Sequence, residues 1–110
     1  MDVFHAVADP VRRSIVERLA DAGEATAGQL AEVARVQFGI SQPTTSKHLK
    51  VLREAGLVTS TVAAQRRVYR LDPRPLVGLA DWATRQSRCW NLKLDALEQH
   101  LLDQPQEERP

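Results

Sequence analysis

The sequence holds little of several residue types that define whole classes of protein. Its one cysteine, Cys89, cannot form a disulfide within the chain, which fits a reducing compartment. Its five aromatic residues are too few for a platform that stacks single-stranded nucleic acid. No apolar run approaches the roughly 18 residues that span a bilayer, and the opening residues lack the basic and then apolar regions of a signal peptide. We therefore expect a cytoplasmic protein with no membrane partner.

Motifs that carry catalysis or bind a cofactor are also missing from the sequence. It has no glycine-rich phosphate loop, no carboxylate pair and no Ser/His/Asp arrangement. His48 stands one residue before Leu49, an expected core residue, and this favours a structural or phosphate-bonding role over a catalytic one. We expect neither enzymatic activity nor a cofactor.

Charge is plentiful, but it is unevenly distributed. Residues 1–41 carry a net −2, residues 42–70 carry +5 and residues 71–110 carry −2, so the total is +1. A basic middle is typical of a surface that meets phosphate, although a solvated basic surface gives the same distribution. With 43% hydrophobic residues, the length of 110 predicts one folded domain over residues 1–104, followed by a polar tail at 105–110.

The first half of the chain predicts four helices. Apolar spacing indicates a short helix over about 2–8, and Asp9 followed by Pro10 is typical of the start of a second, which ends near Gly23. Thr26 can cap a third helix that runs to about residue 36, with a turn at 38–40. Ser41 can cap a fourth over 42–55, whose inner stripe is Thr45, Leu49 and Leu52.

The second half changes its hydrophobic period from 3.6 to 2 and back again. Residues 57–62 and 67–71 predict two strands joined by a loop at 63–66, and a long helix then runs to about residue 102. A helix of roughly 40 Å is longer than a domain of this size, so part of its apolar stripe is expected to meet a second copy of the chain. The candidate dimer contacts are Phe4, Leu79, Trp82, Ala83, Trp90, Leu94 and Leu97.

This order of elements predicts a mostly α fold with a small β-hairpin, a winged helix-turn-helix whose recognition helix is 42–55 and whose wing is 62–67. Short polar side chains at the start of a recognition helix let the backbone approach base edges in the major groove. Gln42 can pair bidentately with adenine, Thr44 and Ser46 can bond bases or phosphates, and Lys47 can reach guanine or phosphate. We therefore expect a double-stranded DNA partner.

Three segments, ADPVRRSIVERL, ISQPTTSKHLKVLREAGLV and RRVYRLDP, resemble the ArsR/SmtB family of bacterial winged-helix repressors in order and spacing. The resemblance implies a homodimer, joined through its first and last helices, that binds an imperfect palindrome and releases it when an inducer arrives. It also implies DNA contacts from the recognition helix and the wing. Together with the helix start, the candidate set is Ser41, Gln42, Thr44, Thr45, Ser46, Lys47, Lys50, Arg66 and Arg67.

The sequence departs from the family pattern in two places. Residues 34–39 predict a connection before the recognition helix that is longer than the family's usual one. The metal-binding patterns are missing, because residues 29–34 hold no Cys-x-Cys and the last helix offers Asp81, followed by Ala83, and only one histidine, His100. A metal site needs three or four converging ligands, so we expect none.

Two other functions remain open from the sequence. The chain could be a metal- or redox-responsive repressor of the same fold that uses Cys89 from both subunits, or a winged-helix module for protein contacts. The basic wing and the polar, uncharged start of the recognition helix favour DNA over protein, because a protein-docking face is richer in aromatic residues.

Overall fold

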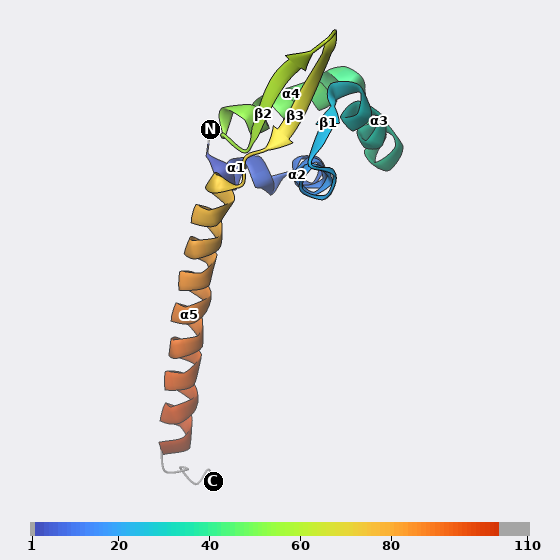
Figure 1. Ribbon diagram of the computed structural model, residues 1–110. Coiled ribbons are helices and arrows are strands. Elements are labelled where there is room, and N and C mark those ends of the chain that lie inside the picture. The colour runs from blue at the N-terminus through green and yellow to red at the C-terminus, as the bar shows by residue number, and fades with distance from the viewer. Residues whose placement is uncertain (1, 104–110) are drawn as a thin grey trace. The chain divides into compact units, whose positions relative to one another are not determined.

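The computed structural model describes residues 2–103, which form mostly helix with a small antiparallel sheet (Figure 1). The predicted fold class is confirmed, whereas the predicted tail at 105–110 lies outside the described residues. In chain order the elements are α1 (Val3–Ala8), α2 (Pro10–Ala22), β1 (Glu24–Thr26), α3 (Ala27–Phe38), α4 (Gln42–Glu54), β2 (Val58–Ala63), β3 (Arg66–Leu71) and α5 (Arg74–Asp103).

The helices begin where the sequence predicts, because side chains there satisfy the free backbone N–H groups of a first turn. Asp9 Oδ1 accepts from the N–H groups of Val11 at 2.8 Å and Arg12 at 3.2 Å, at the start of α2. Thr26 and Gln29 form a reciprocal capping box at the start of α3. Each cap stabilises the start of its helix.

The connection between α3 and α4 is shorter than predicted. Residues 34–38 continue α3, so only residues 39–41 separate the two helices. Gly39 ends α3 in the left-handed region, with φ of 68°, and its N–H donates to the Arg35 carbonyl at 2.9 Å. The prediction of a long connection is therefore wrong, because the residues assigned to the turn belong to α3, which ends at Gly39.

The sheet has a third strand that the sequence did not predict. β3 pairs with both β2 and β1, giving the order β1-β3-β2. β1 is only three residues long, too short for an alternating pattern, and its Ala25 pairs with Tyr69 with both side chains buried. The hairpin loop is also tighter than the predicted 63–66, because Ala63 pairs with Arg66 and only residues 64–65 turn the chain.

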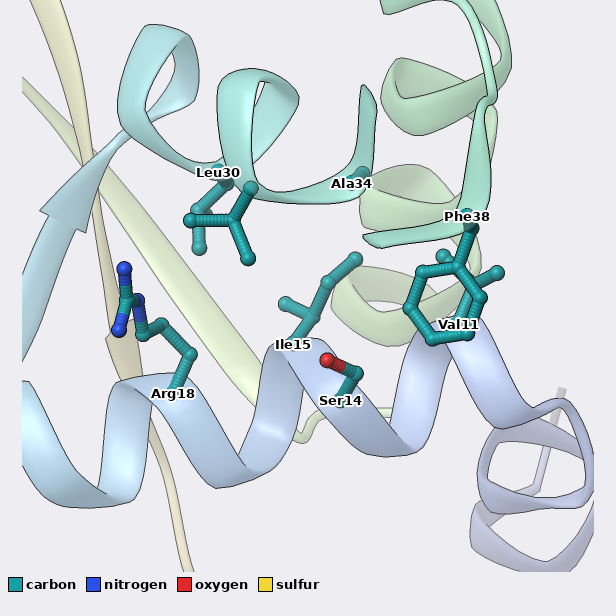
Figure 2. A pocket seen from close by; sticks show the side chains of 8 residues that line it. Val11, Ser14, Ile15, Arg18, Leu30, Ala34 and Phe38 are labelled. Carbon is teal, nitrogen blue, oxygen red and sulfur yellow. The ribbon is translucent and has the colours of Figure 1, made fainter. Parts of the chain in front are cut away.

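The chain divides into two compact units, residues 1–79 and residues from 80 onward. In the first unit, buried side chains from α1, α2, β1, α3, α4 and the sheet form a hydrophobic core. Figure 2 shows Val11 and Ile15 of α2 facing Leu30 and Phe38 of α3. The cavity between these helices measures about 10 Å³, room for a single water molecule at most.

The second unit is the part of α5 that follows Leu79. Every described residue from Ala80 to Asp103 is exposed, and α5 has no buried residue at all. At 1.5 Å per residue its 30 residues extend over roughly 45 Å. No helix in residues 2–103 is both long enough and apolar enough to cross a membrane.

Candidate nucleic-acid interface

α4 has two faces of opposite character. Its inner face packs Thr45, Leu49 and Leu52 into the core, each at most 3% exposed. Its outer face consists of polar and cationic side chains, all exposed: Gln42, Ser46, Lys47 and Lys50. The inner face anchors the helix, and the outer face offers hydrogen-bond donors and acceptors to a partner.

Two of the candidate DNA contacts are engaged in holding the start of α4. The Ser41 hydroxyl accepts from the Thr44 N–H at 3.3 Å and donates to the Thr44 hydroxyl oxygen at 3.0 Å. Ser41 is exposed and Thr44 half-buried, so both can still reach a ligand at the helix start.

Thr45 requires a correction. Its side chain is fully buried and its hydroxyl donates to the Ser41 carbonyl at 3.1 Å. The side chain therefore faces the core, where the hydrophobic spacing also placed it, and we leave it out of the DNA-contact set.

The wing carries exposed arginines with different local partners. Arg67 donates to the Ser60 hydroxyl at 3.1 Å across the hairpin, which orients its guanidinium. Arg70, farther from the tip, donates to Glu24 at 2.5 Å and is thereby tied to β1. Arg66 is the exposed cation next to the two-residue turn. The charge available to a polyanion thus lies at the tip rather than along the whole strand.

The wing tip and the start of α3 line one shallow open hollow. Residues 26–29 form one side and residues 65–67 the other. Sequence reasoning did not associate these segments, because nearly 40 residues separate them and β1, which joins them through β3, was not predicted. Two guanidinium groups beside the positive end of a helix suit a phosphate oxygen.

Comparisons with known proteins also indicate a helix-turn-helix protein. A family model described as a helix-turn-helix domain matches residues 7–61. The HTH-type transcriptional regulator Rv2034 of Mycobacterium tuberculosis is 44% identical over 100 residues, which cover 91% of this chain and 85% of that protein. The arsenical resistance operon repressor of Escherichia coli is 31% identical over 104 residues, covering 94% and 86%.

The solved structures place the fold in the same group. An ArsR-like transcriptional regulator from Rhodococcus sp. RHA1 superposes with a TM-score of 0.75 at 28% identity, over 94% of this chain and 90% of that one. The chain belongs to the ArsR family. It is a DNA-binding transcriptional repressor, and its relatives are regulators rather than enzymes.

Few described residues of this ArsR-family chain are candidates for sensing a metal ion or an oxidant. Within residues 2–103, no three His, Cys, Asp or Glu side chains are grouped closely enough to hold a metal ion. Cys89 is exposed and lies beside Trp90 and Lys93 on α5. The absence of a metal site and the role of Cys89 stay predictions.

The candidate dimer contacts of this ArsR-family chain present a large apolar surface. On α5, Trp90 is 65% exposed, and Leu94 and Leu97 are each just over half exposed. Trp82 and Phe4 are a little less than half exposed, Leu79 is half-buried and Ala83 is exposed. Exposed apolar stripes of this length are unusual in a monomer, because their contact with water is unfavourable.

Proposed function

We propose that this repressor is a cytoplasmic homodimer that binds a palindromic operator through α4 and the wing. The observation that supports the proposal is the two-faced geometry of α4. A buried inner face holds the helix, and the polar side chains of its first two turns point outward. This is the arrangement by which a recognition helix enters the major groove with its N-terminal residues toward the bases.

The proposed contacts divide into two kinds. Gln42, Thr44 and Ser46 read base edges, because short polar or amide side chains match their donors and acceptors. Lys47, Lys50, Arg66 and Arg67 bind mainly phosphate, which raises affinity for any sequence and positions the protein on the duplex. Ser41 holds the helix start beside them.

The apolar stripe of α5 supports the dimer. Leu79, Ala83, Trp90, Leu94 and Leu97 recur at helical spacing on one side of the helix, and Trp82 lies at the edge of that side. We propose that a second copy covers this stripe, together with α1 and its Phe4. A two-fold dimer presents two recognition helices about 34 Å apart, which is one turn of B-DNA.

The first test is the form of the preferred site. The full chain is used to enrich duplexes from a random-sequence library, and we expect inverted repeats whose half-site centres lie about 10 base pairs apart. Enrichment of single asymmetric half-sites would contradict the palindromic operator.

The second test separates the two kinds of contact. On the enriched duplex, Gln42→Ala is expected to cost about 1–3 kcal/mol per half-site, and much less on a scrambled duplex, because a bidentate base contact is lost. Arg66→Ala is expected to weaken both duplexes similarly and to reduce the slope of log affinity against log salt by about one per half-site. Fluorescence anisotropy at several salt concentrations measures both effects.

A matched control for Arg66 is Arg85→Ala, which removes the same charge from the α5 face opposite the apolar stripe. It is expected to leave both affinities and the salt slope nearly unchanged. If Gln42→Ala weakens both duplexes equally, Gln42 does not read bases and the proposed aim of α4 is wrong.

A further inference from the structure

One arginine joins three helices of the first unit. Arg12 lies on α2, and its Nε donates to the Ala6 carbonyl at 2.7 Å while its Nη2 donates to the His5 carbonyl at 3.0 Å. Both carbonyls belong to the last turn and a half of α1. The third nitrogen, Nη1, lies 3.2 Å from Nδ1 of His48 on α4. The guanidinium therefore links α1 to the recognition helix directly.

The contact between Arg12 and His48 has one possible direction. A guanidinium can only donate, so Nδ1 of His48 accepts the hydrogen bond. The ring is 17% exposed, so neighbouring protein groups rather than bulk water surround most of it.

Asp9 is the acidic group that lies nearest to the ring of His48. Asp9 Oδ1 is 4.0 Å from Nδ1, farther than Arg12, and it already accepts from two backbone N–H groups. Burial raises the pKa of Asp9, but those two hydrogen bonds and the charges of His48 and Arg12 outweigh it, so the pKa lies below its ordinary value. α1 contributes the titratable side chain of His5. On α4, the positions three and four residues from His48 hold uncharged side chains: Thr44, Thr45, Val51 and Leu52.

The other contacts of α4 control its angle less strictly. Thr45, Leu49 and Leu52 attach the helix mainly by burial, which is not directional. Hydrogen bonds weaken steeply as their angle departs from linear, so the bond from Arg12 restrains tilt and rotation that apolar packing tolerates. His48 lies one to two turns after Gln42, so a small rotation at His48 displaces the side chains of the first turn.

We propose that Arg12 is a positioning residue for DNA recognition, acting through its hydrogen bond to Nδ1 of His48 to hold α4 at the angle at which its first turn reads bases. The inference rests on the base-reading role proposed for Gln42. α1 also carries Phe4, a proposed dimer contact. The Arg12 guanidinium therefore connects the recognition helix to the proposed subunit interface, and the geometry of that interface sets the spacing between half-sites.

The test compares affinity for the enriched duplex with affinity for its scrambled version. Arg12→Lys keeps the charge but cannot bind three acceptors in the geometry of the guanidinium, and His48→Ala removes the acceptor. Each is expected to reduce the ratio of the two affinities about tenfold, as expected for one charge-assisted hydrogen bond, while binding to scrambled DNA changes little. Thermal unfolding of each variant checks that it is folded at the assay temperature.

His48→Asn is the matched variant, because the Asn side-chain oxygen can lie close to the position of Nδ1 and accept the hydrogen bond from Arg12. We expect it to keep the affinity ratio.

Two outcomes overturn the proposal separately from its premise. If Gln42→Ala lowers the ratio but Arg12→Lys and His48→Ala weaken both duplexes equally, Arg12 only supports folding. If His48→Asn lowers the ratio as His48→Ala does, the hydrogen bond accepted at position 48 does not position α4. If Gln42→Ala leaves the ratio unchanged, base reading by α4 fails and the positioning role fails with it.

Discussion

α4 and the part of α5 after Leu79 are both amphipathic helices, but the apolar side of α4 is buried and that of α5 is exposed to solvent. In α4, Leu49 and Leu52 are buried by other elements of the same chain. In α5, Trp90, Leu94 and Leu97 remain more than half exposed. A hydrophobic stripe indicates that a face needs to be covered, but it does not indicate which chain covers it. The comparison therefore separates apolar surface that the chain buries itself from apolar surface that, in the proposed dimer, a second copy covers.

The largest effect is expected inside the core. Leu52 is fully buried, and Leu52→Ala should lower the free energy of unfolding by about 2–5 kcal/mol, because it removes apolar contacts and leaves a cavity. Urea denaturation followed by circular dichroism at two protein concentrations measures the loss, which we expect at both. Leu92→Ala, at a site 67% exposed, is the control and should stay within about 0.5 kcal/mol of the unaltered protein. A loss as small as that control in Leu52→Ala would contradict the core assignment.

A smaller effect on folding, but a large one on assembly, is expected on α5. The double variant Leu94→Asp with Leu97→Asp should raise the dimer dissociation constant at least about a hundredfold, because two unpaired charges from each subunit would be buried at the interface. Leu92 lies two residues after Trp90 and so on the opposite side of the helix, which makes Leu92→Asp the matched control that keeps the dimer. Sedimentation equilibrium at micromolar concentration measures the mass. An unaltered protein that sediments as one chain of 12.3 kDa would refute the dimer.

The smallest effect is expected on the pKa of Asp72, which lies between β3 and α5. A side-chain hydrogen bond from Arg74, together with its backbone N–H, lowers the pKa of Asp72 to about 2. Arg74→Ala should raise that pKa toward its ordinary value of 3.8, which a carboxyl-carbon NMR titration measures. Because the folded-state pKa is lowered, the stabilisation from this pair is present above pH 3.8 and is lost as pH falls toward about 2. Identical titration midpoints in the two proteins would contradict the role of Arg74.

The sequence predicted those features of the fold that depend on neighbouring residues. Asp9, Thr26 and Ser41 were recognisable as helix caps, since a cap needs only its own side chain and the following backbone N–H groups. β1 was missed because a three-residue strand is defined by its partner, β3, rather than by a pattern of its own. The turn before α4 was overestimated because helix-compatible residues up to Phe38 continue α3 until Gly39.

The candidate site also has residues that the sequence predicts and a hollow that it does not. The exposed residues of α4 could be predicted because a recognition helix alternates buried and exposed positions with helical period. Thr45 could be assigned to the core by spacing, whereas resemblance alone placed it against DNA. The hollow between the wing and α3 could not be predicted, because it depends on strand pairing between distant segments.

What the sequence determined by itself was local: the helix starts, the period of the longer elements, the basic middle of the chain and the family resemblance. Only the tertiary structure decided which side chains meet. It brought Arg12 within hydrogen-bond distance of His48, 36 residues away. It also left the apolar side of α5 exposed among residues 2–103. The physical reason is that hydrophobic period and capping act over a few residues. Directional contacts between helices depend on how the whole core packs, and no short segment specifies that packing.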